Sequence, residues 1–322
     1  MKISVVIPVY NGADILGSTI ESVLAQTLPA HEIIVVSDSS TDDSVAVARS
    51  YGVRVIEQPK SGVCAARNAG ILAATGDWIA LLDHDDFWLP VKLERQAAVA
   101  SEDAKPVFAD FVRRRNGAIQ PVSMLDDPAY RFESLTRRAL TEHASVCTSA
   151  GEEILDVGYF LFPSGVLVER ELMVSVGMFR ENLRLCEDLE CFLRVLAKTS
   201  LVVVKEPLWI WREHTRNNSR DWVGISEGWL SMGGFVEADP ALYPPGTGRR
   251  LASRLRQARR ELISTYTNGD DFTSARRVAR TIPGERPTLY DRLFMLLTSL
   301  PPFVWLSLRM MSRLFHRVRA VS

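Results

Sequence analysis

The sequence predicts an α/β fold built on a doubly wound, mostly parallel sheet flanked by helices. Short apolar runs that suit buried strands occupy residues 3–7, 32–36, 53–57 and 78–82, and helical segments separate them. Strands that alternate with helices in this way form βαβ units and therefore a parallel sheet. Ligands of such sheets bind beyond the carboxyl ends of the strands, so we expect the functional site at that edge.

The first two strands are each followed by polar residues. The first strand leads into a turn at Asn11-Gly12, and a helix from Asp14 to about Gln26 follows. The second strand runs into seven polar residues, 37–43, of which Thr41, Asp42 and Asp43 fit the start of a helix. Asp38 is not needed for that helix start, so it is available to bind a ligand.

The most informative stretch is the fourth strand, residues 78–82, and the acidic turn that follows it. Asp83, Asp85 and Asp86 come directly after this charge-free run. Carboxylates so close together repel one another unless a cation lies between them, and hard oxygen ligands suit Mg²⁺ or Mn²⁺. Taken alone, the same residues could be a solvated turn that caps the helix after Pro90. The chain has neither a GxGxxG after its first strand nor a GxxxxGK[ST], which argues against a dinucleotide fold or a P-loop.

Later segments carry further candidate residues. Gly62 opens a helix with Arg67 and Asn68 about one turn in, and residues 123–158 suit helices and loops that cover the site. Glu187 and Asp188 begin another helix, where they either complement its dipole or supply a general base. Arg212 and His214 follow a strand, and such side chains reach a diphosphate or a metal, or serve local packing.

These motifs together resemble family 2 glycosyltransferases. The resembling segments are residues 3–12, 35–44, 61–71, 78–90, 186–196 and 207–219. The resemblance implies the GT-A fold and inverting, metal-dependent transfer from a nucleotide-diphosphate sugar, UDP-sugar favoured, to an acceptor hydroxyl. It implies a hexosyl or N-acetylhexosaminyl group, a glycan or lipid-linked acceptor, and a role in cell-surface glycan biosynthesis. Ser37 and Ser39 depart from the family's Asp and Gly, which bears on the base or donor that is bound. No Gln-x-x-Arg-Trp and no multi-span membrane segment is present, so we expect single-sugar transfer.

The resemblance also assigns roles to individual residues. Asp188 matches the catalytic base, and the cofactor is Mn²⁺ or Mg²⁺ bound by Asp85, Asp86 and His214. The residues assigned to the donor are Pro8, Tyr10, Asn11, Asp38, Gly62, Arg67, Asn68, Asp83, Asp85 and Arg212. A non-catalytic GT-A-like scaffold at the membrane surface is the alternative. A sugar-nucleotide pyrophosphorylase would need a basic, glycine-rich loop after the first strand, and residues 9–14 hold one Gly and no Lys or Arg.

The resemblance divides the chain into domains. Residues 1–222 form the catalytic domain, with a nucleotide-sugar half at 1–100 and an acceptor and base half at 101–222. Residues 223–248 are expected to be a linker, and 249–322 a basic helical C-terminal extension. This extension holds 15 Arg against 5 acids, which makes +10, so the remainder of a chain of net charge −1 carries −11.

The basic extension suits an anionic membrane surface as partner. Residues 251–269 and 272–281 read as a helix pair. Residues 293–308 are 16 uncharged residues, too few to span a bilayer, and an Arg-rich segment follows, as in a helix lying in the membrane interface. The alternative is that this helix packs on the domain or forms a homodimer.

The remaining features favour a cytoplasmic protein, peripheral on the inner face of the membrane. The four cysteines form no CxxC pair and read as reduced, mostly buried thiols. The N-terminus is already a strand and shows no signal peptide. We expect no nucleic-acid partner.

Overall fold

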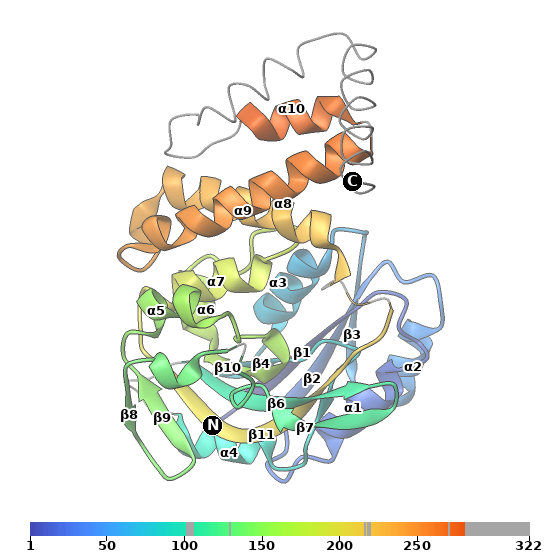
Figure 1. Cartoon of the computed structure of the whole chain (residues 1–322). Coiled ribbons are helices and arrows are strands. Elements are labelled where there is room, and N and C mark those ends of the chain that lie inside the picture. Colours follow the sequence, from blue (N-terminus) through green and yellow to red (C-terminus); the bar gives the residue numbers. More distant parts are fainter. Residues whose placement is uncertain (101–105, 129, 216, 218–219, 270, 281–322) are drawn as a thin grey trace.

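The computed structural model describes residues 1–100, 106–128, 130–215, 217, 220–269 and 271–280 (Figure 1). Within these residues one sheet of 11 strands forms the centre, in the order β3-β2-β1-β4-β10-β6-β11-β9-β8, with β5 on β11 and β7 on β6. The strands are β1 (Ile3–Val9), β2 (Glu32–Asp38), β3 (Arg54–Gln58), β4 (Trp78–Leu81), β5 (Phe87–Trp88), β6 (Val107–Arg115), β7 (Ala118–Ser123), β8 (Arg137–Ala139), β9 (Ala144–Cys147), β10 (Val166–Glu169) and β11 (Leu201–Arg212).

Helices pack around this sheet and continue beyond it at the C-terminal side (Figure 1). The α-helices are α1 (Leu16–Leu24), α2 (Ser44–Ser50), α3 (Val63–Ala73), α4 (Lys92–Val99), α5 (Ala150–Val157), α6 (Arg170–Ser175), α7 (Glu187–Leu196), α8 (Trp222–Ala238), α9 (Thr247–Asn268) and α10 (Phe272–Arg280). Short 3₁₀ turns lie at Phe132–Ser134, Pro163–Gly165 and Pro240–Leu242.

The predicted parallel sheet is present in the first half of the chain. β1 pairs in parallel with β2 and with β4, and β2 pairs in parallel with β3. Every residue of β1 is buried, which explains why its residues other than Ser4 are apolar instead of alternating with polar ones. The helices between the strands make the crossovers that parallel pairing requires.

The second half extends this sheet with mixed pairing. β10 runs antiparallel to both β4 and β6, whereas β6 and β11 are parallel. The register of β11 against β6 shifts between Val204 and Trp209, and β11 also pairs with β5 there. These shifts bring the end of β11, with Arg212, to the turn that follows β4. The expected GT-A-like architecture of a mostly parallel sheet with flanking helices and a helical C-terminal region is confirmed.

The predicted linker at 223–248 is wrong for most of its length, because residues 222–238 form helix α8. Its glycines permit close packing instead of flexibility. A Cβ atom on Gly228 would lie 2.3 Å from the backbone oxygen of Leu185, and one on Gly233 would lie 2.7 Å from Leu255 of α9. Glycine at these positions lets α8 approach both the segment just before α7 and helix α9.

The helical C-terminal region is continuous with the sheet domain at its beginning. Met232, Val236, Tyr243 and Leu251 belong to the main hydrophobic core, whereas Leu262 and Ile263 of α9 form a separate cluster with α10. The expected helix pair is therefore present as α9 and α10. The predicted interfacial segment at 293–319 lies outside the described residues. No helix in the described part is long and apolar enough to cross a membrane.

The four cysteines are all free thiols, as predicted. Cys64, Cys147 and Cys191 are buried, and Cys186 is half-buried.

Gly70 on α3 provides a test of how closely this helix packs on the sheet. A Cβ atom there would lie 2.3 Å from Val6 of β1, so we expect Gly70→Ala to lower the free energy of unfolding by about 1–3 kcal/mol. Gly234→Ala on α8 is the matched control, because a Cβ atom there meets nothing within 4 Å. That change should leave stability unchanged or raise it by about 0.5–1 kcal/mol. Urea unfolding measures both, and equal effects would contradict the packing argument.

Candidate functional site

The candidate site lies where the parallel strands β1, β2 and β4 end. Val9 pairs with Ser37, and Val6 pairs with Leu81, so the residues that follow these strands meet at one edge. Asn11, Asp38 and Asp83 all lie at this edge, as predicted. Asn11 adopts a φ of 50° and accepts a hydrogen bond at its Oδ1 from the Thr41 N–H at 2.8 Å. This contact ties the turn after β1 to the turn after β2.

Asp38 is a nearly buried carboxylate that organises the loop before α3. Its oxygens accept hydrogen bonds from the backbone N–H groups of Ser61 (2.7 Å) and Gly62 (3.0 Å) and from the Gln58 side chain (3.0 Å). Burial alone would raise the pKa of Asp38, but these hydrogen bonds and one from Lys60 outweigh it, and the net pKa lies below its ordinary value. Asp38 is therefore a fixed negative charge beside Gly62.

Tyr10 and Lys60 form the exposed wall beside Asp38. The ammonium of Lys60 lies 3.2 Å from Asp38 Oδ2 and stands over the Tyr10 ring. Tyr10 is 45% exposed, so its ring is accessible at the edge of the sheet. Pro8, by contrast, is buried within β1 opposite Val36, and its side chain does not reach this surface.

Arg67 connects the two halves of the site. Its guanidinium donates to Asp83 Oδ1 at 2.7 Å and to Glu187 Oε1 at 2.9 Å, and its side chain is only 4% exposed. Burial acts to lower the pKa of Arg67, but the negative charges of Asp83 and Glu187 outweigh it and raise the pKa above its ordinary value. A permanent positive charge therefore joins the turn after β4 to the first residue of α7.

Asn68 has a different place from the one the sequence predicted. Its amide nitrogen donates to the Phe179 carbonyl at 2.8 Å and to Glu181 at 3.2 Å, while its Oδ1 accepts from the Phe179 N–H at 3.0 Å. Both ends of the amide are thus engaged within the protein. Asn68 fixes the segment that leads to α7, and the structure does not support it as a donor contact.

The three carboxylates after β4 lie in three different environments. Asp83 pairs with Arg67, and Asp85 Oδ2 lies 2.8 Å from His214 Nε2 and 3.4 Å from the Asn217 amide. Burial acts to raise the pKa of Asp85, but the hydrogen bond from His214 and the nearby imidazole of His84 hold it below its ordinary value. Asp85 and Asp83 are therefore the partly exposed charges of this turn.

Asp86 is turned inward. Its oxygens accept from Ser164 Oγ at 2.5 Å and from the Arg212 N–H at 3.3 Å, and the residue is 4% exposed. Burial, followed by the charges of Asp85 and Asp83, raises the pKa of Asp86 well above its ordinary value. The structure therefore does not support the prediction that Asp86 binds a metal, because it is a buried acid engaged with the second half of the chain.

Arg212 holds this turn together. Its Nε donates to the Asp85 carbonyl at 2.6 Å, and its two terminal nitrogens donate to Ser18 Oγ (3.0 Å), Thr19 Oγ1 (2.8 Å) and the Asp86 carbonyl (3.0 Å). All three guanidinium nitrogens are thus used within the protein. The structure does not support Arg212 as a direct donor contact and makes it a support for the acidic turn.

The residues present fit a divalent cation only in part. Among the described residues, no group of three or more His, Cys, Asp or Glu side chains is arranged to hold a metal ion. Asp85 and His214 do supply one carboxylate and one imidazole in contact. Magnesium commonly takes one or two carboxylates and completes its shell with substrate phosphates and water. The pair therefore fits a site that a bound diphosphate would complete.

Asp188 lies in the first turn of α7, after Cys186, which adopts a φ of 64°. Burial, and next the charge of the adjacent Glu187, raises the pKa of Asp188 to about 7, although Arg67 acts against this. One of its oxygens accepts from the Leu189 N–H at 2.7 Å. A half-buried carboxyl that titrates near neutrality is suited to accept a proton.

A buried network fixes α7 behind Asp188. Glu190 is fully buried and accepts from Arg180 (2.8 Å), from Arg194 (2.9 and 2.7 Å) and from the Tyr243 hydroxyl (2.6 Å). Arg194 also donates to the Met178 carbonyl at 2.6 Å. The predicted orienting pair of Glu190 and Arg194 is present and is part of this larger network.

Sequence reasoning missed several residues of the site. Ser164 bonds Asp86 and also accepts from the Asp83 N–H at 3.1 Å, and Lys60 and Tyr243 act as described above. Ser164 stands in a Pro-Ser-Gly turn that carries no motif, and Tyr243 lies in a segment rich in Pro and Gly. Only Lys60 had a local signal in the sequence, because it stands directly before the Ser61-Gly62 segment that opens α3.

Comparisons with known proteins agree with this fold. The model of the family described as Glycosyl transferase family 2 matches residues 4–151. The uncharacterized glycosyltransferase YibD of Escherichia coli is 40% identical over 124 residues, which are 36% of each chain. The uncharacterized glycosyltransferase RP339 of Rickettsia prowazekii is 28% identical over 64% of this chain and 62% of its own. The chain thus matches about a third to three fifths of these relatives' length.

Solved structures share the fold. S. aureus TarS 1–349 in complex with UDP aligns with a TM-score of 0.59 at 19% identity, over 96% of this chain and 92% of its own. The mannosyltransferase PcManGT from Pyrobaculum calidifontis, in complex with GDP-Man and Mn²⁺, aligns with a TM-score of 0.52 at 14% identity, over 92% and 84%. The sheet of this chain therefore has the GT-A fold of these structures. Over residues 4–151 the chain is similar to glycosyl transferase family 2.

Proposed function

We propose that the protein is an inverting glycosyltransferase that moves a sugar from a nucleotide-diphosphate sugar to an acceptor hydroxyl. One observation carries the proposal: Arg67 pairs with Asp83 at the strand edge and with Glu187 next to Asp188. The same buried guanidinium, that of Arg67, thus fixes the strand edge proposed to bind the donor and the start of the helix that carries Asp188. The pKa of Asp188 is about 7. An inverting transfer requires these two parts side by side.

The donor would bind across the ends of β1, β2 and β4. Tyr10, Asn11 and Gly62 surround the fixed charge of Asp38, and Asp83 and Asp85 are the partly exposed carboxylates. S. aureus TarS has been solved with UDP and with UDP-GlcNAc, which favours a UDP-sugar here. A hexosyl or N-acetylhexosaminyl group and a glycan or lipid-linked acceptor in cell-surface glycan biosynthesis complete the proposal.

The chemistry assigned to the chain is a single displacement. The Asp188 carboxylate takes the proton of the acceptor hydroxyl while the oxygen attacks the anomeric carbon, and the nucleotide diphosphate leaves from the opposite face. Mn²⁺ or Mg²⁺, held by Asp85 and His214 with Asp83 beside them, would act as a Lewis acid toward the leaving diphosphate. Asp86 and Arg212 keep the acidic turn in place from behind.

The proposal divides the chain differently from the sequence prediction. The catalytic unit includes α8 and the start of α9, because they share its hydrophobic core. A membrane-facing role for the C-terminal extension and a place on the inner face of the membrane concern residues beyond 280, so they stay predictions.

Thermal unfolding with nucleotides tests the donor site. We expect UDP with Mn²⁺ to stabilise the protein more than GDP or dTDP does. Relative to the protein without ligand, the stabilisation by UDP should be about 2.7 kcal/mol at a hundredfold excess over Kd. Asp85→Asn should remove the part of the shift that depends on Mn²⁺. Asp239→Asn, a change at an exposed carboxylate before a 3₁₀ turn, is the control and should keep the whole shift. No metal-dependent shift with any nucleotide would favour the non-catalytic scaffold.

Asp188→Asn tests the base. The transfer rate should fall by about 100-fold or more, because an amide cannot accept the proton, while stabilisation by UDP and Mn²⁺ persists. Glu171→Gln on α6 removes an exposed carboxylate and should leave the rate unchanged. Transfer at the wild-type rate by Asp188→Asn would refute the assignment.

The raised pKa of Asp188 also predicts how stability depends on pH. Between the ordinary value of 3.8 and about 7, the unfolded chain releases this proton while the folded protein keeps it. The free energy of unfolding of the wild type should therefore fall relative to that of Asp188→Asn as pH rises through this window, and stay level above it. The total change should not exceed about 4.5 kcal/mol, since one pKa unit corresponds to about 1.4 kcal/mol. Urea unfolding of both proteins at several pH values measures the difference, and a constant difference would contradict the shift.

A further inference from the structure

Three half-buried aromatic side chains, Tyr159, Phe162 and Trp211, form a surface that the donor chemistry does not use. We call this surface the aromatic platform. The rings of Phe162 and Trp211 are stacked with centroids 5.9 Å apart and planes 20° apart. The Tyr159 ring meets Phe162 edge to face at 5.7 Å. Each of the three residues is half-buried rather than fully buried.

The aromatic platform rests on a rigid base. The fully buried Phe111 contacts Phe162 at 5.5 Å and Trp211 at 6.2 Å, both edge to face. Trp209, also buried, packs against Phe111 with ring centroids 4.3 Å apart. Trp211 and Trp209 belong to β11, and Phe111 to the neighbouring β6. The exposed rings are therefore held by a packed layer and need no rearrangement to bind a ligand.

The platform is attached to the acidic turn at two points. Phe162 lies two residues before Ser164, whose hydroxyl bonds Asp86. Trp211 directly precedes Arg212, whose N–H also bonds Asp86. Asp86 thus fixes both chain segments that carry the stacked rings beside the turn that ends the donor edge.

The same platform extends toward the proposed base. Burial, and next the negative charges of Asp188 and Glu187, raise the pKa of Tyr159, so this ring lies within the field of the base helix. A group that rests on the platform would therefore lie beside the acidic turn, where the charge of Asp188 is felt. An acceptor whose hydroxyl is to be deprotonated belongs in this position.

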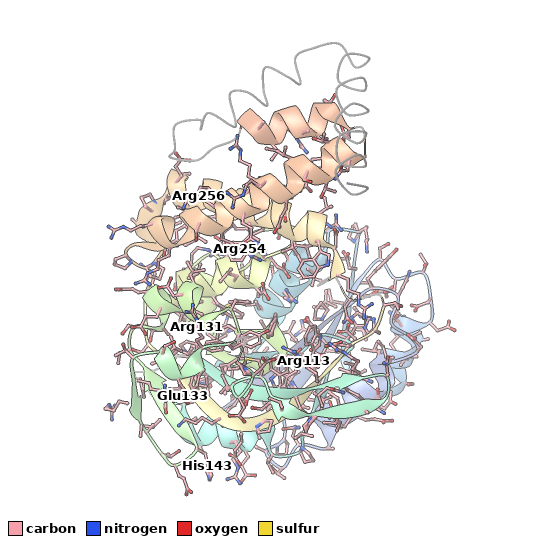
Figure 2. All side chains as sticks on the ribbon, in the orientation of Figure 1. Arg113, Arg131, Glu133, His143, Arg254 and Arg256 are labelled. Atoms are coloured by element: carbon pink, nitrogen blue, oxygen red, sulfur yellow. The ribbon has the colours of Figure 1, made fainter. Side chains whose placement is uncertain are left out.

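Polar groups border the rings. The Arg113 guanidinium stands over the Trp211 ring, with its central carbon 5.6 Å from the ring centroid. Its terminal nitrogens contact Asp127 (3.4 Å) and the Tyr130 hydroxyl (3.4 Å). Figure 2 labels Arg113 over the sheet. Arg113 Nε is buried without an acceptor in the described structure. The indole N–H of Trp211 makes no hydrogen bond to the described residues and is not buried.

We infer that the aromatic platform is an acceptor subsite that binds a sugar ring, so the acceptor is a carbohydrate; this inference rests on the proposed function. The C–H groups on one face of a pyranose carry partial positive charge, and the faces of aromatic rings are negative, so the two attract on stacking. Hydroxyl groups at the edge of the sugar would meet the Trp211 N–H and the Arg113 side chain. An acyl or prenyl chain would leave those polar groups without partners, which disfavours it.

Saturation-transfer NMR tests this inference on the whole protein with its donor site filled by UDP and Mn²⁺. The probes are methyl glycosides of common hexoses, deoxyhexoses and N-acetylhexosamines. At least one should bind, with the strongest saturation on the C–H protons of one ring face. Trp211→Leu and Phe162→Leu should each weaken its Kd about tenfold, which corresponds to about 1.4 kcal/mol. Stabilisation by UDP and Mn²⁺ should stay as in the wild type.

Trp229→Leu is the matched control. Trp229 is a half-buried tryptophan on α8 with the Arg254 guanidinium 5.1 Å above its ring, and Figure 2 labels Arg254 in the helical layer away from Arg113. This variant should bind the methyl glycoside as the wild type does. If Trp211→Leu does not fold, as judged by circular dichroism, Phe162→Leu decides the question.

Two results would overturn the inference while the proposed function stands. The first is that UDP with Mn²⁺ stabilises the protein, yet no methyl glycoside binds and vesicles that contain a prenyl phosphate do. The second is that both platform variants bind the glycoside as tightly as the Trp229→Leu control. If no nucleotide stabilises the protein at all, the proposed function itself is wrong and the platform cannot be an acceptor subsite.

Discussion

The buried ion pairs of Arg67 are the interaction on which the rest of the site depends. A guanidinium taken out of water is tolerated only when its charge is balanced, and Asp83 and Glu187 supply that balance from opposite sides. Without Arg67, both Asp83 and Glu187 would lose this cationic partner. The helix that carries Arg67 can lie close enough to the sheet because Gly70, almost one turn later, has no side chain against Val6. A backbone feature and an electrostatic one thus determine the same geometry.

The acidic turn shows how one short motif can hold three separate functions. Asp83 pairs with Arg67, Asp85 contacts His214, and Asp86 is buried against Ser164 and the backbone of Arg212. If all three were solvated and charged, their mutual repulsion would oppose the turn. Burial of Asp86 favours its neutral form and so removes one of the charges. The acidic turn therefore depends on the buried Asp86 as much as on the partly exposed Asp83 and Asp85.

The sequence predicted the first half of the fold because its information there is local. Apolar runs and polar ends identify β1, β2 and β4 directly, and parallel pairing then brings Asn11, Asp38 and Asp83 to one edge. The sequence did not show those contacts in which a side chain's partner is distant in the chain. Asn68 bonds Phe179, and Arg212 bonds Thr19, contacts that no spacing within a motif encodes. Residues 222–238 lie beyond the segments that carry the resemblance, and the sequence alone did not show that their glycines allow close helix packing.

The network around Glu190 extends the same logic to the C-terminal helices. A fully buried carboxylate is stable only with partners, and one of its partners, Tyr243, comes from the segment between α8 and α9. Glu190 lies two residues after Asp188 on the same helix, so whatever holds Glu190 also holds the proposed base. The packing of α8 against Leu185 and Cys186 acts on the residues just before that helix. The helices after residue 222 therefore do not merely follow the catalytic unit, because they supply part of the support that fixes the orientation of α7.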